Sequence, residues 1–436
     1  MKRFLALAIA ALMILSCAAC SSDGNGDTTA AEGTTAADTV SDVIAAPAND
    51  DTTAPSETAV PAENGDNTAS PAPADRNNNI NIKPAGTAKP SAGGSSTVTP
   101  PKTDDTPVEV ETDPKKIIVS AEKEWIFTEK ITDSCHASTV LPLDDGSVIA
   151  AWFGGSSEKK NDVNIYTSVR TEEDGWSEPV VVSAAAEIAH WNPVLFQKED
   201  GTVILYFKVG KDTDYWQTYY ATSTDGRSWS TPKELVPGDN SGGRGPVKNK
   251  PIRLKDGTVL APASTEIDGE WRAFVDISND DGETWTRTEN VDSKYCICFK
   301  VPMIQPTLWQ SADGSVHMLT RTKVGKIYRS DSYDNGKTWC RAYATKLPSN
   351  NSGIDLDTDD QGRIFLAYNN IGAPGIRTPL VLSVSTDDGK TFTKIKTFER
   401  GLAEYSYPAV VVKGDTIHIT YTYERDYIAY WQIKVK

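Results

Sequence analysis

Apolar and polar positions alternate in short runs from residue 115 to the C-terminus. Runs of β-branched and aromatic residues are separated by Gly, Asp, Asn and Pro, which is the pattern of strands and turns. An apolar strand that leads into a Gly-bearing turn occurs six times, as TVLPLDDGSVIAAW, PVLFQKEDGTVILYF, PIRLKDGTVLAPA, PTLWQSADGSVHML, DLDTDDQGRIFLAY and PAVVVKGDTIHITY. No helical periodicity of useful length intervenes, so the pattern predicts an all-β domain of six units.

A second marker repeats with the same spacing. It reads SYDNGKTW at Ser332–Trp339, and its other copies are SNDDGETW (Ser278–Trp285), STDDGKTF (Ser385–Phe392), STDGRSW (Ser223–Trp229) and a degenerate EEDGW (Glu172–Trp176). Repeats of about 54 residues with three or four short strands each predict a six-bladed β-propeller. The last unit is short, and we expect Lys115–Phe127 to supply its outer strand and close the ring.

The motif SYDNGKTW superficially resembles the start of an EF-hand calcium loop. The later ligands of such a loop, ending in a bidentate Glu, are absent. The motif also resembles the Asp box of sialidases and related propellers. On this interpretation Asp334 accepts hydrogen bonds from the turn, Gly336 is left-handed and Trp339 packs between neighbouring blades. We therefore expect a structural hairpin turn.

The N-terminal residues have a different composition. A positively charged start precedes the apolar run Phe4–Leu15, which is too short to span a bilayer and ends in ILSCAACSS. This segment resembles a bacterial lipobox. Residues 1–20 are therefore predicted to be a lipoprotein signal peptide that is lipidated on Cys17, with Cys20 as the other candidate and an ordinary secretory signal as the alternative.

Residues 21–114 contain no Phe, Trp, Tyr or Leu. They hold 16 Asp and Glu against 4 Lys and Arg, which accounts for −12 of the net charge of −16. Such a segment buries too little apolar surface to offset chain entropy, so we predict a disordered acidic linker before the propeller at residues 115–436. The acidity therefore describes the linker and says little about the partners of the folded domain.

The inner strands of a propeller converge on a central cavity, so equivalent strand starts predict its lining. The Pro of PVLF sets a common register for five of the six units, whereas the unit near Asn351 and Ser352 lacks this Pro. Three positions before it stand His136, His190, Lys248, Met303 and Tyr405. One position before it stand Ser138, Asn192, Lys250, Gln305 and Tyr407. This polar, basic and aromatic ring suits a small polar ligand.

Across Ser134–Lys436 the chain resembles a propeller of the sialidase superfamily with BNR repeats. The resemblance lies in the segments NDVNIYTSVR, LTRT, NNIGAPGIRTPLVLSVSTDDGKTF and EYSYPAVVVKGDTIHITYTYE. It implies that Asp162 is the acid/base and that Arg321 and Arg377 bind a carboxylate. It also implies a tyrosine nucleophile, either Tyr405 or Tyr407.

Two departures from the family pattern change the expected chemistry. Sialidases have Arg-Ile-Pro where this chain has His136-Ala-Ser-Thr, and a Glu where it has Gln305. A Gln cannot take a proton, so the tyrosine lacks its usual base. His136 and His190, at equivalent positions of adjacent blades, could instead abstract a proton beside a uronate carboxylate, with Tyr405 or Tyr407 as the acid.

The sequence thus predicts a carbohydrate-active enzyme that removes terminal, acidic sugars from glycans, by glycoside hydrolysis or by elimination. The alternative is a non-catalytic glycan-binding propeller. The predicted catalytic residues are Asp162, Tyr405, Tyr407, His136 and His190. The predicted substrate-binding residues are Arg321, Arg377, Gln305, Trp191, Asn192, Lys248 and Lys250. We expect a monomer on the bacterial cell surface, facing outward, with a glycan partner, a membrane contact only through the lipid anchor, no nucleic acid and no cofactor.

Overall fold

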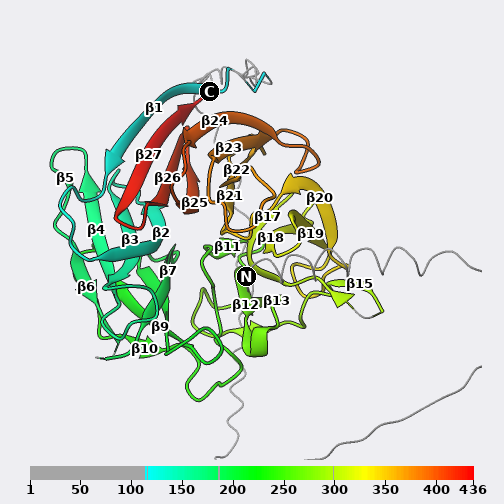
Figure 1. Cartoon of the computed structure of the whole chain (residues 1–436), viewed down its shortest axis with the longest axis horizontal. Coiled ribbons are helices and arrows are strands. Elements are labelled where there is room, and N and C mark those ends of the chain that lie inside the picture. Colours follow the sequence, from blue (N-terminus) through cyan, green and yellow to red (C-terminus); the bar gives the residue numbers. More distant parts are fainter. Residues whose placement is uncertain (1–112, 115, 185–186, 298) are drawn as a thin grey trace, which may run out of the picture. The chain divides into compact units, whose positions relative to one another are not determined.

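The computed structural model describes residues 113–436, apart from 115, 185–186 and 298. This part consists of strands and turns with one 3-10 turn, η2 (Ile267–Gly269). Six antiparallel sheets are arranged around a common centre, so the predicted six-bladed propeller is confirmed (Figure 1). No helix within the described residues is long and apolar enough to cross a membrane. The predicted signal peptide and the linker up to residue 112 lie outside the described residues.

Each of these six sheets is one blade. The blades are numbered in chain order, and the strands of each blade are given from the centre outward. Blade 1 has β2 (Ser134–Pro142), β3 (Val148–Gly155), β4 (Asn164–Thr171), β5 (Gly175–Trp176) and β6 (Val180–Val182). Blade 2 has β7 (His190–Gln197), β8 (Val203–Val209), β9 (Gln217–Ser223) and β10 (Lys233–Glu234). Blade 3 has β11 (Ile252–Arg253), β12 (Val259–Thr265), β13 (Arg272–Ser278) and β14 (Thr286–Arg287).

The hairpin of β15 (Lys294–Cys296) and β16 (Phe299–Lys300) connects blades 3 and 4. Blade 4 has β17 (Met303–Gln310), β18 (Val316–Thr322), β19 (Lys326–Ser332) and β20 (Tyr343–Pro348). Blade 5 has β21 (Asp355–Thr358), β22 (Ile364–Asn369), β23 (Leu380–Ser385) and β24 (Thr393–Glu399). Blade 6 has β25 (Tyr405–Lys413), β26 (Thr416–Tyr423) and β27 (Tyr427–Val435).

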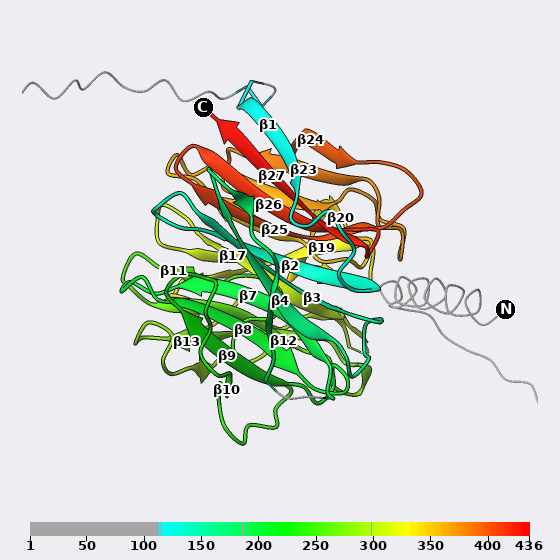
Figure 2. The ribbon, with the colours of Figure 1, turned by 90° about the vertical axis from the view of Figure 1, so that its left-hand side faces the viewer.

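The N-terminal strand β1 (Ile118–Trp125) closes the ring. It pairs antiparallel with β27, from Ile118 opposite Val435 to Trp125 opposite Ala429, and becomes the outer strand of blade 6 (Figure 2). The expectation that the segment before blade 1 completes the last blade is therefore confirmed. Closure by β1 leaves no unpaired outer edge on β27, which a closed propeller requires.

The core lies between neighbouring sheets. The second strands are the most buried: every residue of β3, β8 and β12 is buried. Between blades 1 and 2, for example, Ile149, Phe153 and Ile165 pack with Leu205 and Phe207. Burial on both faces explains why these strands read as continuous apolar runs in the sequence.

The Asp boxes form the predicted turns between the third and fourth strands. Asp334 Oδ1 accepts a hydrogen bond from Thr338 N at 2.9 Å, and Ser332 Oγ accepts one from Gly336 N at 2.9 Å. Gly336 has φ +81°, and a Cβ there would lie 2.6 Å from Leu260 of blade 3. Trp339 packs against the cluster shared by blades 3 and 4. The structural interpretation of this motif is confirmed.

Strand direction defines two faces of the propeller. Inner strands begin at one face, which we call the mouth, and the connections from second to third strands lie there too. Turns from first to second strands and the Asp boxes lie at the opposite face, because neighbouring strands are antiparallel. The predicted site residues at the strand starts therefore belong to the mouth.

Candidate active site

Each blade places one left-handed residue at or just before its inner strand. These residues are Ala137, Asn192, Lys248, Gln305, Asn351 and Tyr407, with φ between 41° and 71°. The strand pairing of blades 1, 2, 4 and 6 shifts register at the same place. Non-glycine residues rarely adopt this conformation, and repeated instances at one place in a fold accompany functional sites. The six positions form a ring at the mouth.

Tyr407 and Gln305 meet at one arginine in this ring. Arg321, near the end of β18, donates from Nη1 to Tyr407 Oη at 2.6 Å and to Gln305 Oε1 at 3.0 Å. Its Nε donates to Asn351 Oδ1 at 3.1 Å. Residues of blades 4, 5 and 6 are thereby joined around one guanidinium, which is only 6% exposed.

Arg377, which precedes β23, also lies close to the Tyr407 ring. The centres of the Arg377 and Arg321 guanidinium groups lie 5.4 and 5.5 Å from that ring. Arg377 Nη1 donates to Glu404 Oε1 at 2.5 Å. Nη2 of both arginines makes no hydrogen bond among the described residues, so each guanidinium keeps donors for a ligand. Two such forks can hold a carboxylate.

Glu404, directly before β25, connects Arg377 to a third arginine. Arg425, in the turn between β26 and β27, donates from Nε to Glu404 Oε2 at 3.3 Å and from Nη1 to Glu158 at 2.7 Å. Burial alone would raise the pKa of Glu404, but Arg377 and Arg425 outweigh it and hold that pKa below its usual value. Glu404 is therefore ionised at neutral pH.

His136 lies behind Tyr407. The two ring centroids are 4.2 Å apart, and the His136 residue is 2% exposed. Its Nδ1 lies 3.9 Å from Glu404 Oε1 and has no hydrogen-bond partner. Burial, and then the charges of Arg425 and Arg377, lower the pKa of His136 well below its usual value. The imidazole is therefore neutral at pH 7.

A loop from blade 3 adds a further carboxyl group and an aromatic ring. Glu266 follows β12, and Trp271 precedes β13. The Trp271 ring lies 5.1 Å from the guanidinium of Arg321 and 3.7 Å from Lys323 Nζ. Burial raises the pKa of Glu266 although Arg321 and Lys323 oppose the shift. A carboxyl that keeps its proton to higher pH beside an arginine suits general acid catalysis.

A model of the BNR repeat-like domain matches residues 146–419, which is more than half of the chain. The chain belongs to the BNR repeat-like domain family. No curated protein matches this BNR-repeat chain by sequence. The family assignment agrees with the blade count and with the Asp boxes of the structure.

Solved structures show the same fold at low sequence identity. A protein of unknown function from Dyadobacter fermentans has a TM-score of 0.60 at 16% identity, over 73% of this chain and 100% of that chain. The Hadza microbial sialidase Hz136 has a TM-score of 0.59 at 17% identity, over 70% of this chain. A Trypanosoma rangeli sialidase in complex with the inhibitor DANA has a TM-score of 0.57 at 14% identity, over 72% of this chain. This BNR-repeat chain spans only 66% and 60% of the two sialidases.

Of the two tyrosines predicted as nucleophile, the BNR-repeat propeller places only Tyr407 on the arginines. Tyr405 is buried in the core of blades 5 and 6, and its hydroxyl lies 3.5 Å from Glu424. Burial, with the neighbouring Tyr423, raises the pKa of Tyr405 to about 12. Of the two predicted tyrosines, Tyr407 is therefore the one whose hydroxyl contacts Arg321.

His190 is held entirely by backbone groups. Its Nδ1 lies 3.0 and 2.9 Å from two carbonyl oxygens, and its Nε2 accepts from a backbone N–H at 2.9 Å; the partners are Val163, Ile188 and Ala184. Burial lowers the pKa of His190, and the residue is 0% exposed. No ring nitrogen is left for a substrate, so the predicted catalytic role finds no support in this geometry.

Trp191 is also committed to packing. Its Nε1 donates to the carbonyl oxygen of Gly210 at 2.8 Å, and its ring meets Trp216 edge-on at 5.9 Å. At 2% exposure it offers no face to a ligand. Asn192, in contrast, occupies the left-handed position of blade 2 at the mouth, and its predicted role in substrate binding stays a prediction.

The side chains of the predicted basic residues of blade 3 reach backbone carbonyl groups of other blades. Lys248 Nζ donates to the carbonyl oxygens of Ile354 at 3.1 Å and Pro408, which joins blades 3, 5 and 6. Lys250 Nζ donates to the carbonyl oxygen of Leu356 at 2.7 Å. Burial lowers the pKa of Lys248 to about 7. Both lysines hold blades together and do not present charge to the mouth.

Asp162 lies in the exposed loop before β4. Its two carboxylate oxygens accept from Ser156 N at 2.8 Å and Ser156 Oγ at 3.0 Å. These bonds, the backbone one first, lower the pKa of Asp162. The same loop carries Glu158, which reaches Arg425. Asp162 thus flanks the site through its loop, and its role as acid/base stays a prediction.

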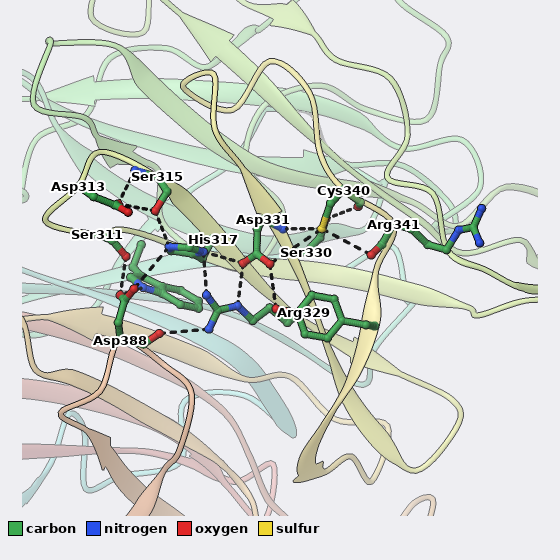
Figure 3. Close-up of polar contacts among 12 residues, drawn as sticks. Ser311, Asp313, Ser315, His317, Arg329, Ser330, Asp331, Cys340, Arg341 and Asp388 are labelled. Carbon is green, nitrogen blue, oxygen red and sulfur yellow. Dashed lines mark hydrogen bonds and ion pairs between the residues drawn. The ribbon is translucent and has the colours of Figure 1, made fainter.

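Figure 3 shows a second polar cluster that resembles a catalytic triad. It lies at the opposite face, because Ser315 belongs to the turn between β17 and β18, the first and second strands of blade 4. Ser315 Oγ lies 3.0 Å from His317 Nε2, and His317 Nδ1 lies 2.6 Å from Asp331 Oδ1. Ser315 Oγ also donates to Asp313 at 2.5 Å, and Arg329 Nε donates to Asp331 at 2.7 Å. The serine and the aspartate are therefore occupied, which indicates a structural network between blades 4 and 5.

Sequence reasoning missed Glu158, Glu266, Trp271, Glu404 and Arg425. All five lie in connections between strands, where the alignment on inner strand starts gave no position. Among these residues, only Glu404 could have been suspected from the sequence, because it directly precedes Tyr405 and Ser406. Arg425 and Glu158 are 267 residues apart, and only the closed ring brings them together.

Proposed function

We propose that this BNR-repeat propeller removes a terminal acidic sugar from a glycan by hydrolysis. The observation that carries this proposal is Tyr407, whose hydroxyl accepts from Arg321 at 2.6 Å while Arg377 lies beside its ring. A sugar carboxylate on the free donors of the two arginines would place its anomeric carbon near the tyrosine. The sialidases with the same fold act on sugars of this class, which supports the choice of substrate.

Tyr407 would act as the nucleophile without a neighbouring base. Gln305 occupies the place where a carboxylate would take the phenol proton. In the proposed reaction that proton passes to water in the mouth, and Arg321 stabilises the negative charge on the phenol oxygen. The tyrosine oxygen bonds to the anomeric carbon as the glycosidic bond breaks, and a carboxylic acid protonates the leaving oxygen. Water then hydrolyses the sugar–tyrosine bond.

Elimination at a uronate is less well supported. It requires His136 to reach a proton on the substrate, but this residue lies behind Tyr407 and is 2% exposed. The pKa of His136, lowered by burial and by Arg425, also makes it a weak base. A non-catalytic glycan-binding propeller is favoured by one observation, which is Gln305 in place of a carboxylate.

The experiment is to incubate the protein with sialyllactose, an aryl glucuronide and a rhamnose-capped glucuronate, with Tyr407→Phe as control. Free acidic sugar without new ultraviolet absorbance supports hydrolysis. An unsaturated uronate, which absorbs in the ultraviolet, would show elimination instead. Binding of a glycan by calorimetry without any product would identify a binding module and overturn the proposal.

We also propose that a lipid on Cys17, or else Cys20, holds the enzyme on the bacterial surface. The support is the apolar run and the ILSCAACSS segment. Radiolabelled palmitate should enter the parent protein and be lost in the Cys17→Ala variant. Labelling that survives the double variant Cys17→Ala/Cys20→Ala would contradict the proposal.

A further inference from the structure

A cavity of about 520 Å³ lies beside the candidate active site. One wall is the turn η2 with the residues that follow it, and the other is the β15–β16 hairpin between blades 3 and 4. The lining includes Glu270, Trp271, Arg272, Lys294, Phe299 and Lys300. This volume falls in the range of pockets for small ligands.

The cavity opens on the same face as the active site. The turn η2 follows the second strand of blade 3, and the hairpin directly precedes the inner strand of blade 4, so both belong to the mouth. Trp271 lines the cavity and also lies 5.1 Å from the Arg321 guanidinium. The cavity and the carboxylate-binding arginine therefore share one aromatic side chain.

The lining combines aromatic surface with positive charge. Trp271 and Phe299 supply rings, and the exposed Lys294 and Lys300 have no ion-pair partner among the described residues. Arg272 is neutralised by Glu270 at 2.5 Å. Aromatic faces stack on sugar rings, and unpaired lysines attract carboxylate or sulfate groups. This chemistry fits an acidic sugar better than a neutral one.

The β15–β16 hairpin exposes large apolar side chains, which is typical of a surface that binds a partner or ligand. Ile297 is 92% exposed and Tyr295 is 63% exposed, on a two-stranded sheet that pairs with no blade. An isolated hairpin gains little stability from its own contacts. Of these two residues, Ile297 lines the cavity that the same hairpin helps to form.

We propose that this cavity is a second sugar subsite, which holds an acidic unit of the same glycan behind the terminal sugar. The inference rests on the proposed function, because that function places the terminal sugar on Arg321 and Arg377. Trp271 lies between the two subsites. Lys294 and Lys300 attract the negatively charged group of the second sugar unit. The protein is thus selective for acidic oligosaccharides over acidic monosaccharides.

The test compares Lys294→Glu/Lys300→Glu with Lys337→Glu/Lys390→Glu. The second pair lies in exposed Asp-box turns at the opposite face and makes the same change in net charge. Calorimetry measures binding of tetragalacturonate, a chondroitin tetrasaccharide and a sialylated tetrasaccharide, each beside its neutral methyl ester. We expect the first variant to bind the acidic probe about tenfold more weakly than the control variant, and a thermal melt to show that both fold.

The outcomes separate this inference from the proposed function. If the parent cleaves no substrate but Lys294→Glu/Lys300→Glu weakens binding of an acidic tetrasaccharide, the subsite stands and the proposed function fails. If the parent cleaves a short aryl glycoside, the same variant should leave that rate unchanged and raise KM for the tetrasaccharide. Equal binding by both variants, or equal binding of acids and methyl esters, overturns the subsite.

Discussion

At the residue scale, Tyr407 owes its position to a single backbone conformation. Its φ of 54° and the register shift between Ser406 and Ala409 place its side chain at the mouth, whereas Tyr405 packs in the core of the blade. Two tyrosines two residues apart would share one face of a regular strand. The irregularity places the two side chains in different surroundings, so Tyr407→Phe and Tyr405→Phe should affect activity differently.

Tyr407→Phe should lower kcat by at least about 100-fold, because it removes the proposed nucleophile. The substitution keeps the aromatic ring near both arginines. Binding of the acidic sugar, measured by calorimetry, should persist. Tyr405→Phe is the matched control and should keep most of the activity. A Tyr405→Phe variant as inactive as Tyr407→Phe would reverse the assignment of the nucleophile.

Glu266→Gln should change the pH dependence of kcat/KM. Burial raises the pKa of Glu266, so this carboxyl holds its proton above the usual range and loses it as the pH rises. If Glu266 donates the proton to the leaving oxygen, kcat/KM in the parent falls on the alkaline side as the group ionises. The variant should be slower and should lack that fall.

Asp162→Asn is the companion measurement for the general acid. The pKa of Asp162 is lowered by Ser156, so this group is ionised over most of the working range. The Asp162→Asn substitution should leave the alkaline decrease of kcat/KM unchanged. If instead Asp162→Asn removes the fall and Glu266→Gln keeps it, Asp162 is the proton donor, as the family resemblance implies.

At the scale of elements, the Asp boxes brace the outer strands far from the site. In the box between β19 and β20, Asp334 accepts from both the N–H and the hydroxyl of Thr338, at 2.9 and 2.6 Å. The left-handed Gly336 next to it lets the turn approach Leu260 of the neighbouring blade. These boxes therefore contribute to packing between blades and not to chemistry.

Asp334→Ala should lower the free energy of unfolding by about 1–2 kcal/mol, because turn donors lose their acceptor. Chemical denaturation measures the change. Activity per folded molecule should match the parent. Asp360→Ala is the control, since this exposed turn residue makes no side-chain hydrogen bond among the described residues. Equal stability of the two variants would contradict a structural role for the box.

At the scale of the whole molecule, the ring depends on contacts between blades that are distant in sequence. The strand β1 joins β27 across the full length of the domain. Lys248 of blade 3 also donates hydrogen bonds to backbone carbonyl groups of blades 5 and 6. Its ammonium is fully enclosed, so the central contact is sensitive to protonation.

Lys248→Met should flatten the rise of stability with pH. Burial lowers the pKa of Lys248 from its usual value of 10.5 to about 7 in the folded state. Between these values the unfolded chain binds the proton and the folded chain does not, so folding becomes more favourable as the pH rises. The measurement is the urea midpoint at intervals from pH 7 to about 9.5.

Two further variants control this prediction. Lys208→Met should also reduce the slope, because burial lowers the pKa of Lys208 to about 7 as well. Lys337→Met, in an exposed turn, should leave the slope as in the parent. A Lys248→Met protein whose stability rises as steeply as that of the parent would show that Lys248 stays charged in the folded state.

The sequence by itself determined the architecture and part of the site. Strand alternation and turn chemistry are local, so they gave six blades, the Asp boxes and the strand that closes the ring. Motif resemblance located Arg321 and Arg377, and the repeat phase located Gln305 and Tyr407, all of which meet in the structure.

Only the tertiary structure decided which residue of each blade takes the left-handed conformation at the mouth. In blades 1 and 3 the left-handed residues are Ala137 and Lys248. Alignment on the proline placed the equivalent positions at Ser138 and Lys250 instead. A single such residue reverses which neighbours face the cavity, and sequence period does not show it. Ring closure then brings distant loops together, which is why Glu404, Arg425 and Glu158 became visible as one network around the predicted arginines.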